Sequence, residues 1–71
     1  MTLPEARQRV DDAFSRDAPG LIENGGVALR IENDPEDNAA FQVWITAPTQ
    51  YQAQIRLIVR TALAREKVTF M

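Results

Sequence analysis

The chain has 71 residues, with eight Lys and Arg side chains, ten Asp and Glu side chains, and neither His nor Cys. A chain this short has room for one domain, spanning residues 1–71. Without Cys it cannot form disulfides or thiolate zinc sites, and without His or Cys it lacks the usual bases and nucleophiles of catalytic triads. We therefore expect no catalytic residues, no metal and no cofactor.

The composition predicts a soluble protein with a small core. Leu, Ile, Val and Phe make up 18 of the 71 residues. This is about a quarter of the chain, whereas disordered chains usually contain less than roughly 20% of these residues. Small cores are often marginally stable, so self-association or a partner would add stability. No apolar run exceeds three residues, whereas a membrane helix needs about 20 and a signal peptide at least about 7. We expect a cytoplasmic protein without membrane contact.

Residues 3–16 are predicted to form the first helix. Thr2 and Glu5 have the spacing of a capping box, in which each side chain satisfies a free backbone N–H of the other residue. Apolar residues recur at helical spacing on one face, namely Leu3, Ala6, Val10, Ala13 and Phe14. The Pro-Gly pair at 19–20 should end the helix. The segment 21–23 that follows is predicted to be either a short strand or a covering loop.

Two strands of alternating polarity are predicted on either side of an acidic loop. Their apolar positions are Val27, Leu29 and Ile31 in the first strand and Phe41, Val43 and Ile45 in the second. Pairing Ile31 with Phe41 puts all six on one side of an antiparallel hairpin. The loop at 32–38 contains four carboxylates but lacks the spacing of a calcium-binding EF-hand. We expect a solvated turn, with an acidic docking patch as the alternative.

Residues 50–66 are predicted to form the second long helix, opened by a capping box between Thr49 and Gln52. One face is apolar, with Tyr51, Ile55, Ile58, Val59 and Ala62. The short β-prone segment 68–70 is suited to an extra edge strand. The expected fold is a small two-layer α+β domain in the order α-β-β-α, with an antiparallel β-hairpin packed on two helices and short extra strands as an option.

Three cations fall on one side of the second helical wheel: Arg56, Arg60 and Lys67. Such a set is most often a solvated outer face. The alternative is a contact with phosphate or with an acidic protein partner. Nucleic-acid binding is not favoured by the net charge of −2, because dedicated nucleic-acid binders are usually basic.

Trp44 is the residue that most directly suggests a function. Strand alternation directs it away from the core side of the hairpin, together with Gln42. In the expected register Ala28 lies opposite Trp44, and Arg30 lies on the diagonal, where its guanidinium can stack on the ring. Two alternatives stay open, because either a covering segment such as 68–70 or a one-residue register error would bury the indole.

These observations predict a non-enzymatic protein-interaction module. A small inhibitor or adaptor, of the kind found in phages and plasmids, has this profile, and so does an assembly subunit that binds copies of itself. The predicted interaction surface contains Trp44, Arg30, Ala28 and Gln42. The alternative function is a nucleic-acid-associated protein that uses the basic face of the second long helix.

Overall fold

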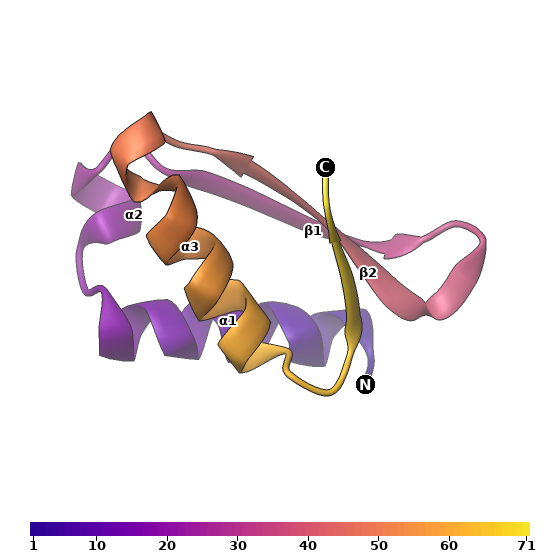
Figure 1. The fold of residues 1–71 in the computed structure, drawn as a ribbon. Coiled ribbons are helices and arrows are strands. Elements are labelled where there is room, and N and C mark those ends of the chain that lie inside the picture. The colour runs from indigo at the N-terminus through magenta and orange to yellow at the C-terminus, as the bar shows by residue number, and fades with distance from the viewer.

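The computed structural model describes residues 1–71 as a small α+β domain with three helices and a three-stranded sheet. Along the chain the elements are α1 (Leu3–Asp17), α2 (Leu21–Asn24), β1 (Ala28–Asp34), β2 (Asp37–Thr46), α3 (Thr49–Ala62) and β3 (Lys67–Phe70). The helices α1 and α3 lie on the same side of the β1–β2 hairpin, and the hairpin tip projects beyond them (Figure 1). None of the helices combines the length and apolar character needed to cross a bilayer.

The first predicted helix is confirmed, and α1 extends one residue further, to Asp17. Thr2 is its N-cap: the Thr2 hydroxyl accepts from the Glu5 backbone N–H at 3.4 Å and donates to Glu5 Oε1 at 3.2 Å. The buried residues of α1 are four of the five predicted ones, Ala6, Val10, Ala13 and Phe14. The apolar stripe of this helix therefore faces the core.

The second long helix, α3, differs from its prediction at both ends. Thr49 is the first helical residue and not the cap, because Pro48 occupies the N-cap position without a side-chain hydrogen bond. Gln52 turns back instead, and its Nε2 donates to the Ala47 carbonyl oxygen at 3.0 Å. The helix ends at Ala62, since the backbone leaves helical geometry at Leu63.

The segment after α1 is a single helical turn, α2, so the predicted strand or loop at 21–23 is wrong. Gly20 precedes it with a φ of +82°, in the left-handed region that glycine adopts without steric cost. This residue lets the chain reverse directly from α1 into α2. Leu21 and Ile22 then pack, partly buried, against the core.

The sheet is mixed, with β2 in the centre, β1 antiparallel on one side and β3 parallel on the other. In the hairpin Ile31 pairs with Val43, so the predicted pairing of Ile31 with Phe41 is wrong by two residues. The cause is the turn, where a register irregularity pairs Asp34 with Asp37 and lets β2 begin earlier than expected. Because the slip is two residues, each side chain keeps its predicted face.

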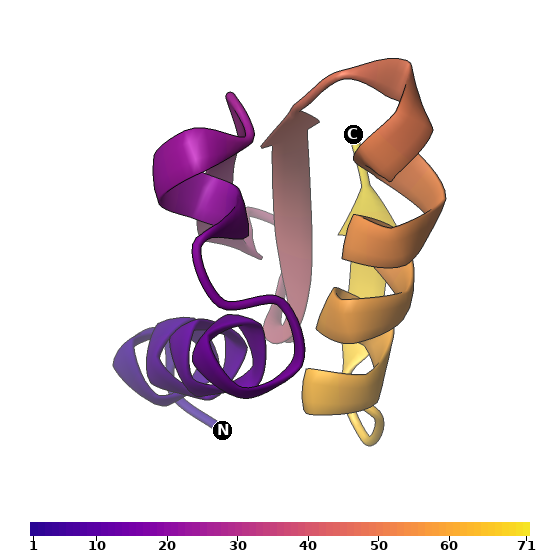
Figure 2. The same ribbon diagram turned by 90° about the vertical axis from the view of Figure 1, so that its left-hand side faces the viewer.

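One apolar core joins α1, α3 and one face of the sheet. Phe41 and Val43 of β2 are completely buried in it, as is Ile55 of α3. The predicted C-terminal strand exists as β3, and its Val68 and Phe70 pack against the same core. Figure 2 shows β2 between α1 and α2 on one side and α3 on the other, with β3 behind α3. The expected α-β-β-α order thus holds only roughly, because α2 and β3 add elements and the sheet is mixed.

Candidate functional site

Trp44 lies on the face of β2 that points away from the core. It is half-buried and is not part of the apolar cluster that joins the helices to the sheet. The C-terminal strand does not cover it, because β3 pairs Val68 with Phe41 and Phe70 with Val43 and thereby places its apolar side chains on the core face. Trp44 therefore belongs to the outer face of the sheet.

Arg30 is the direct partner of Trp44 across the hairpin, and its Cζ lies 4.0 Å from the centroid of the indole ring. The expectation that Ala28 lies opposite Trp44 is wrong: the two-residue register shift places Ala28 opposite Thr46. A cation–π contact of this kind contributes about 0.5–1 kcal/mol at an exposed site. The stack holds the guanidinium over the ring, and Arg30 itself is exposed.

The outer face continues from this stack along the sheet. Gln42 lies in its middle, paired with Glu32 on β1 and with Thr69 on β3. Of the four predicted interaction residues, the structure thus gathers Trp44, Arg30 and Gln42 on one face, and Ala28 is the first residue of β1. We refer to Trp44, Arg30 and Gln42 as the outer-face cluster.

The predicted set of three cations is divided by the fold. Arg56 and Arg60 remain together on α3, with their Cζ atoms 5.7 Å and 5.1 Å from the centroid of the Phe70 ring. Lys67 does not join them, because α3 ends at Ala62 and Lys67 starts β3. The Lys67 Nζ is 3.5 Å from Asp37 Oδ2 at the base of the hairpin turn.

The carboxylates of the acidic loop organise the hairpin turn. Asp34 Oδ1 accepts a hydrogen bond from the Glu36 backbone N–H at 2.8 Å, and Asp37 Oδ1 accepts one from the Ala39 N–H at 2.9 Å. Such bonds from a carboxylate to the backbone two residues later are typical of tight turns. The structure contains no group of three or more His, Cys, Asp or Glu side chains arranged to hold a metal ion.

Arg7 makes a contact that no spacing rule reveals in the sequence. Its Nε and Nη2 donate to the Ile31 carbonyl oxygen at 3.3 Å and 3.0 Å, and Nη2 also donates to Glu32 Oε2 at 2.9 Å. Arg7 thus reaches from α1 to the backbone of β1 and to a side chain of the outer face. The residues it joins are 24 and 25 positions away in the chain.

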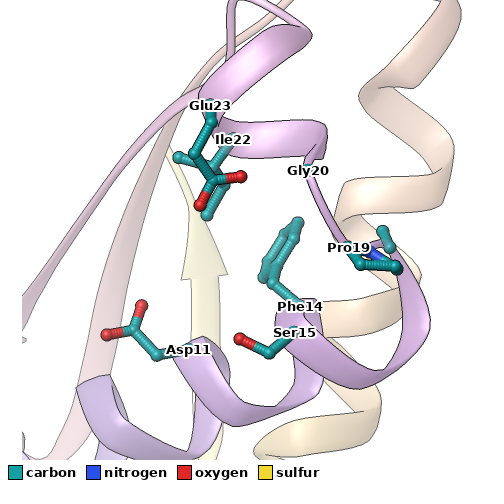
Figure 3. Close-up of a pocket in the computed structure, with 8 residues that line it drawn as sticks. Asp11, Phe14, Ser15, Pro19, Gly20, Ile22 and Glu23 are labelled. Carbon is teal, nitrogen blue, oxygen red and sulfur yellow. The ribbon is translucent and has the colours of Figure 1, made fainter.

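Two neighbouring hollows lie between α1, α2 and β1. The first, of about 400 Å³, is lined by side chains that include Asp11, Ser15 and Phe14 of α1 and Glu23 of α2, and Figure 3 shows them around it. The second, of about 370 Å³, runs beside β1 and shares Asp11 and Ile22 with the first. A depression therefore extends from the end of α1 to the edge of the sheet.

Comparisons with protein-family models, with curated proteins and with solved structures find no match for this chain. Its function is therefore argued from these surfaces.

Proposed function

We propose that the protein is a non-enzymatic protein-interaction module that binds its partner through the outer face of the β1–β2 hairpin. The observation that carries this proposal is the Arg30–Trp44 stack, whose ring centroid and guanidinium carbon are 4.0 Å apart. Trp and Arg are the residue types most enriched among interface residues that dominate binding energy. A stacked arginine is also already ordered, which lowers the entropy lost when a partner binds.

The energy available from Trp44 is sufficient to decide an association. Complete burial of an aromatic side chain covers about 150–250 Å², or about 4–6 kcal/mol at about 25 cal/mol per Å². Trp44 is already partly buried and exposes at most about a third of its surface, so at most about a third of this, roughly 1.5–2 kcal/mol, remains for a partner. Each 1.4 kcal/mol corresponds to a factor of about ten in the dissociation constant. One residue can therefore change affinity by about 10- to 30-fold.

The form of interaction that we propose is a small cytoplasmic inhibitor or adaptor, including the phage or plasmid type, or an assembly subunit that binds copies of itself. The absence of His and Cys from the chain supports a role without catalysis or a cofactor. The short chain supports association, since a small core gains stability when further apolar surface is covered.

The test compares Trp44→Ala with the wild-type chain and with Leu57→Ala, which removes an exposed apolar side chain from α3. Light scattering and analytical ultracentrifugation measure self-association, and affinity capture from the source cells measures partner binding. We expect Trp44→Ala to weaken binding at least 10-fold with an unchanged far-UV circular dichroism spectrum, and Leu57→Ala to bind normally. Wild-type binding by a folded Trp44→Ala variant would refute the proposal.

The second candidate function is association with nucleic acid through α3. The observation that favours it is the pair of guanidiniums over the Phe70 ring, on a helix whose sequence contains no Asp or Glu. Phosphate contacts release counterions, so binding of this kind falls steeply with salt. Retention on DNA or RNA that decreases with salt, and that Arg56→Ala with Arg60→Ala abolishes, would favour this function over the first.

A further inference from the structure

We propose that the free edge of β1 binds an extended segment of a partner protein as an added strand, and that Arg7 occupies this edge until the segment displaces it. The inference rests on the proposed function only in that the chain acts by binding a protein. It adds a second surface, the edge of β1, which shares only Arg30 with the outer-face cluster, and it specifies a mode of binding and the chemistry of the bound segment.

The first observation is the position of β1 in the sheet. The strand order of the sheet is β1-β2-β3, so β1 is paired with another strand on one side only. The strand is seven residues long. An edge strand presents a row of backbone N–H and C=O groups to which another strand can add. The opposite edge, β3, is only four residues long. The longer free edge is therefore the better template.

The second observation is the contact of Arg7 with this edge. The Ile31 carbonyl oxygen accepts from Arg7 Nε at 3.3 Å and from Nη2 at 3.0 Å, which shows that it is turned toward α1. Backbone groups of alternate residues point the same way in a strand, so those of Leu29 and Asn33 face the same edge. An added strand would compete with Arg7 at Ile31.

The Arg7 contact is weak enough to be displaced. The ion pair between Arg7 and Glu32 joins side chains that are 51% and 40% exposed. Exposed ion pairs contribute little to stability. An incoming strand forms several backbone hydrogen bonds along the edge, so it can replace the contact at Ile31. Arg7 thus protects the β1 edge from non-specific strand pairing, as charged side chains do at many sheet edges.

The third observation is the hollow beside the edge, which determines one face of the bound segment. Four of its seven lining residues are apolar, namely Val10, Ile22, Leu29 and Ile31, and the other three are Arg7, Asp11 and Arg30. Alternate side chains of an added strand point toward this hollow. Apolar side chains fit there against the four apolar residues.

The other side chains of the segment face the outer surface of the sheet, next to Arg30. The guanidinium of Arg30 stacks on Trp44 and takes part in none of the ion pairs of the structure. Opposite charges on adjacent strands stabilise the pair. The bound segment therefore alternates apolar side chains, toward the hollow, with outward side chains, of which the one beside Arg30 is acidic. Its outward neighbour beside Glu32 is uncharged, because like charges on adjacent strands repel each other.

A segment of a partner fits this edge better than the β1 strand of a second copy. Both α1 and α2 lie on the β1 side of β2 (Figure 2). If a second copy paired through its own β1, its α1 and α2 would approach the α1 and α2 of the first copy. Paired strands are about 4.8 Å apart, whereas a helix is about 10 Å wide, so the helices of the two copies would collide. An isolated strand has no such obstacle.

The experiment uses the blocked heptapeptide Val-Thr-Val-Asp-Val-Thr-Val, called the Val–Asp peptide. The same peptide with Lys in place of Asp, called the Val–Lys peptide, is the charge control. Nuclear magnetic resonance measures amide hydrogen exchange at Leu29, Ile31 and Asn33. We expect the Val–Asp peptide to slow exchange at these amides at least 10-fold and the Val–Lys peptide to bind at least 10-fold more weakly. Two further versions of the Val–Asp peptide are N-methylated, one at every Val and the other at the Thr and Asp residues. They differ in which edge of the peptide can form hydrogen bonds, and we expect one of them to lose binding.

The protective role of Arg7 is tested with Arg7→Ala. The matched control is Arg9→Ala, because it removes an exposed arginine of the same helix. We expect Arg7→Ala to bind the Val–Asp peptide about two- to fivefold more tightly than Arg9→Ala, since about 1 kcal/mol corresponds to a factor of about five. Equal affinity of the two variants would overturn the role of Arg7. Unchanged exchange at the three β1 amides, or equal binding of both methylated peptides, would overturn the strand site.

Three outcomes separate this inference from the alternatives. If Arg7→Ala forms a dimer and ignores the peptide, the occupant is a second copy, and the partner segment is wrong. If partner capture depends on Trp44 but the β1 amides are not protected by the Val–Asp peptide, only the edge site fails, and the proposed function stands. If the amides are protected but Trp44→Ala captures the partner normally, the outer-face proposal fails and the edge site stands.

Discussion

Ile58 and Leu57 are neighbours on α3 whose replacement by Ala should reduce stability by very different amounts. Ile58 is 7% exposed and belongs to the core, whereas Leu57 is 66% exposed. The sequence predicted this difference, because Ile58 lies on the apolar stripe of the helix and Leu57 lies beside it. The pair tests the helical phase with two substitutions that remove similar amounts of side chain from adjacent positions.

The expected magnitudes follow from burial. Truncation of a buried Ile to Ala costs about 2–5 kcal/mol, because transfer free energy is lost and a cavity is left behind. Leu57 buries about a third of its side chain, and complete burial is worth about 1.5–3 kcal/mol, so Leu57→Ala should cost about 0.5–1 kcal/mol. A domain of this length has a total stability of about 4–11 kcal/mol. Ile58→Ala thus removes a large fraction of it.

Urea denaturation followed by circular dichroism measures both variants. With a slope of about 1 kcal/mol per M for a small protein, Ile58→Ala should lower the midpoint by about 2 M or more, and Leu57→Ala by less than about 1 M. An unchanged slope shows that the variants unfold in the same way. A larger loss for Leu57→Ala would show that the helical phase of α3 is wrong, and with it the packing of this helix on the sheet.

Three further predictions concern the surface. Thr2→Ala removes the N-cap of α1 and should lower stability by about 0.5–2 kcal/mol, measured by thermal melting, whereas Thr2→Ser should retain most of the stability that the cap supplies. Replacing the three carboxylates at 34, 36 and 37 by amides should leave the melting temperature nearly unchanged with and without Ca²⁺, and stabilisation of the wild type by Ca²⁺ would contradict this. The hydrogen bond from the Arg16 guanidinium lowers the pKa of Asp17, so Arg16→Ala should raise that pKa in a carbon-detected titration. The pKa of Asp17 is lower in the folded chain than in the unfolded chain. The small contribution of the Arg16–Asp17 pair to stability is therefore present above the unfolded pKa and is lost as pH falls through the folded pKa.

Local sequence patterns are sufficient to predict the two long helices and the faces of the hairpin. The apolar spacing over residues 3–16 fixes which side of α1 is buried, and the same holds for Ile55, Ile58 and Val59 on α3. Alternation along β2 likewise directs Trp44 away from the core. These features depend on the periods of the helix and the strand, which are local properties that a linear pattern contains. The helix α2 could not be predicted from the sequence, because four residues are too few to show the helical period of apolar residues.

Which side chains meet depends on the packing of distant segments. A slip of two residues leaves the alternation of a hairpin unchanged, so the turn at Asp34–Asp37, and not the pattern, placed Arg30 opposite Trp44. The parallel pairing of β3 with β2 removed Lys67 from the basic face of α3 and placed the Phe70 ring under its two arginines. The contact between Arg7 and the edge of β1 joins distant segments. Such contacts form because the core brings the elements together, and no local period encodes them.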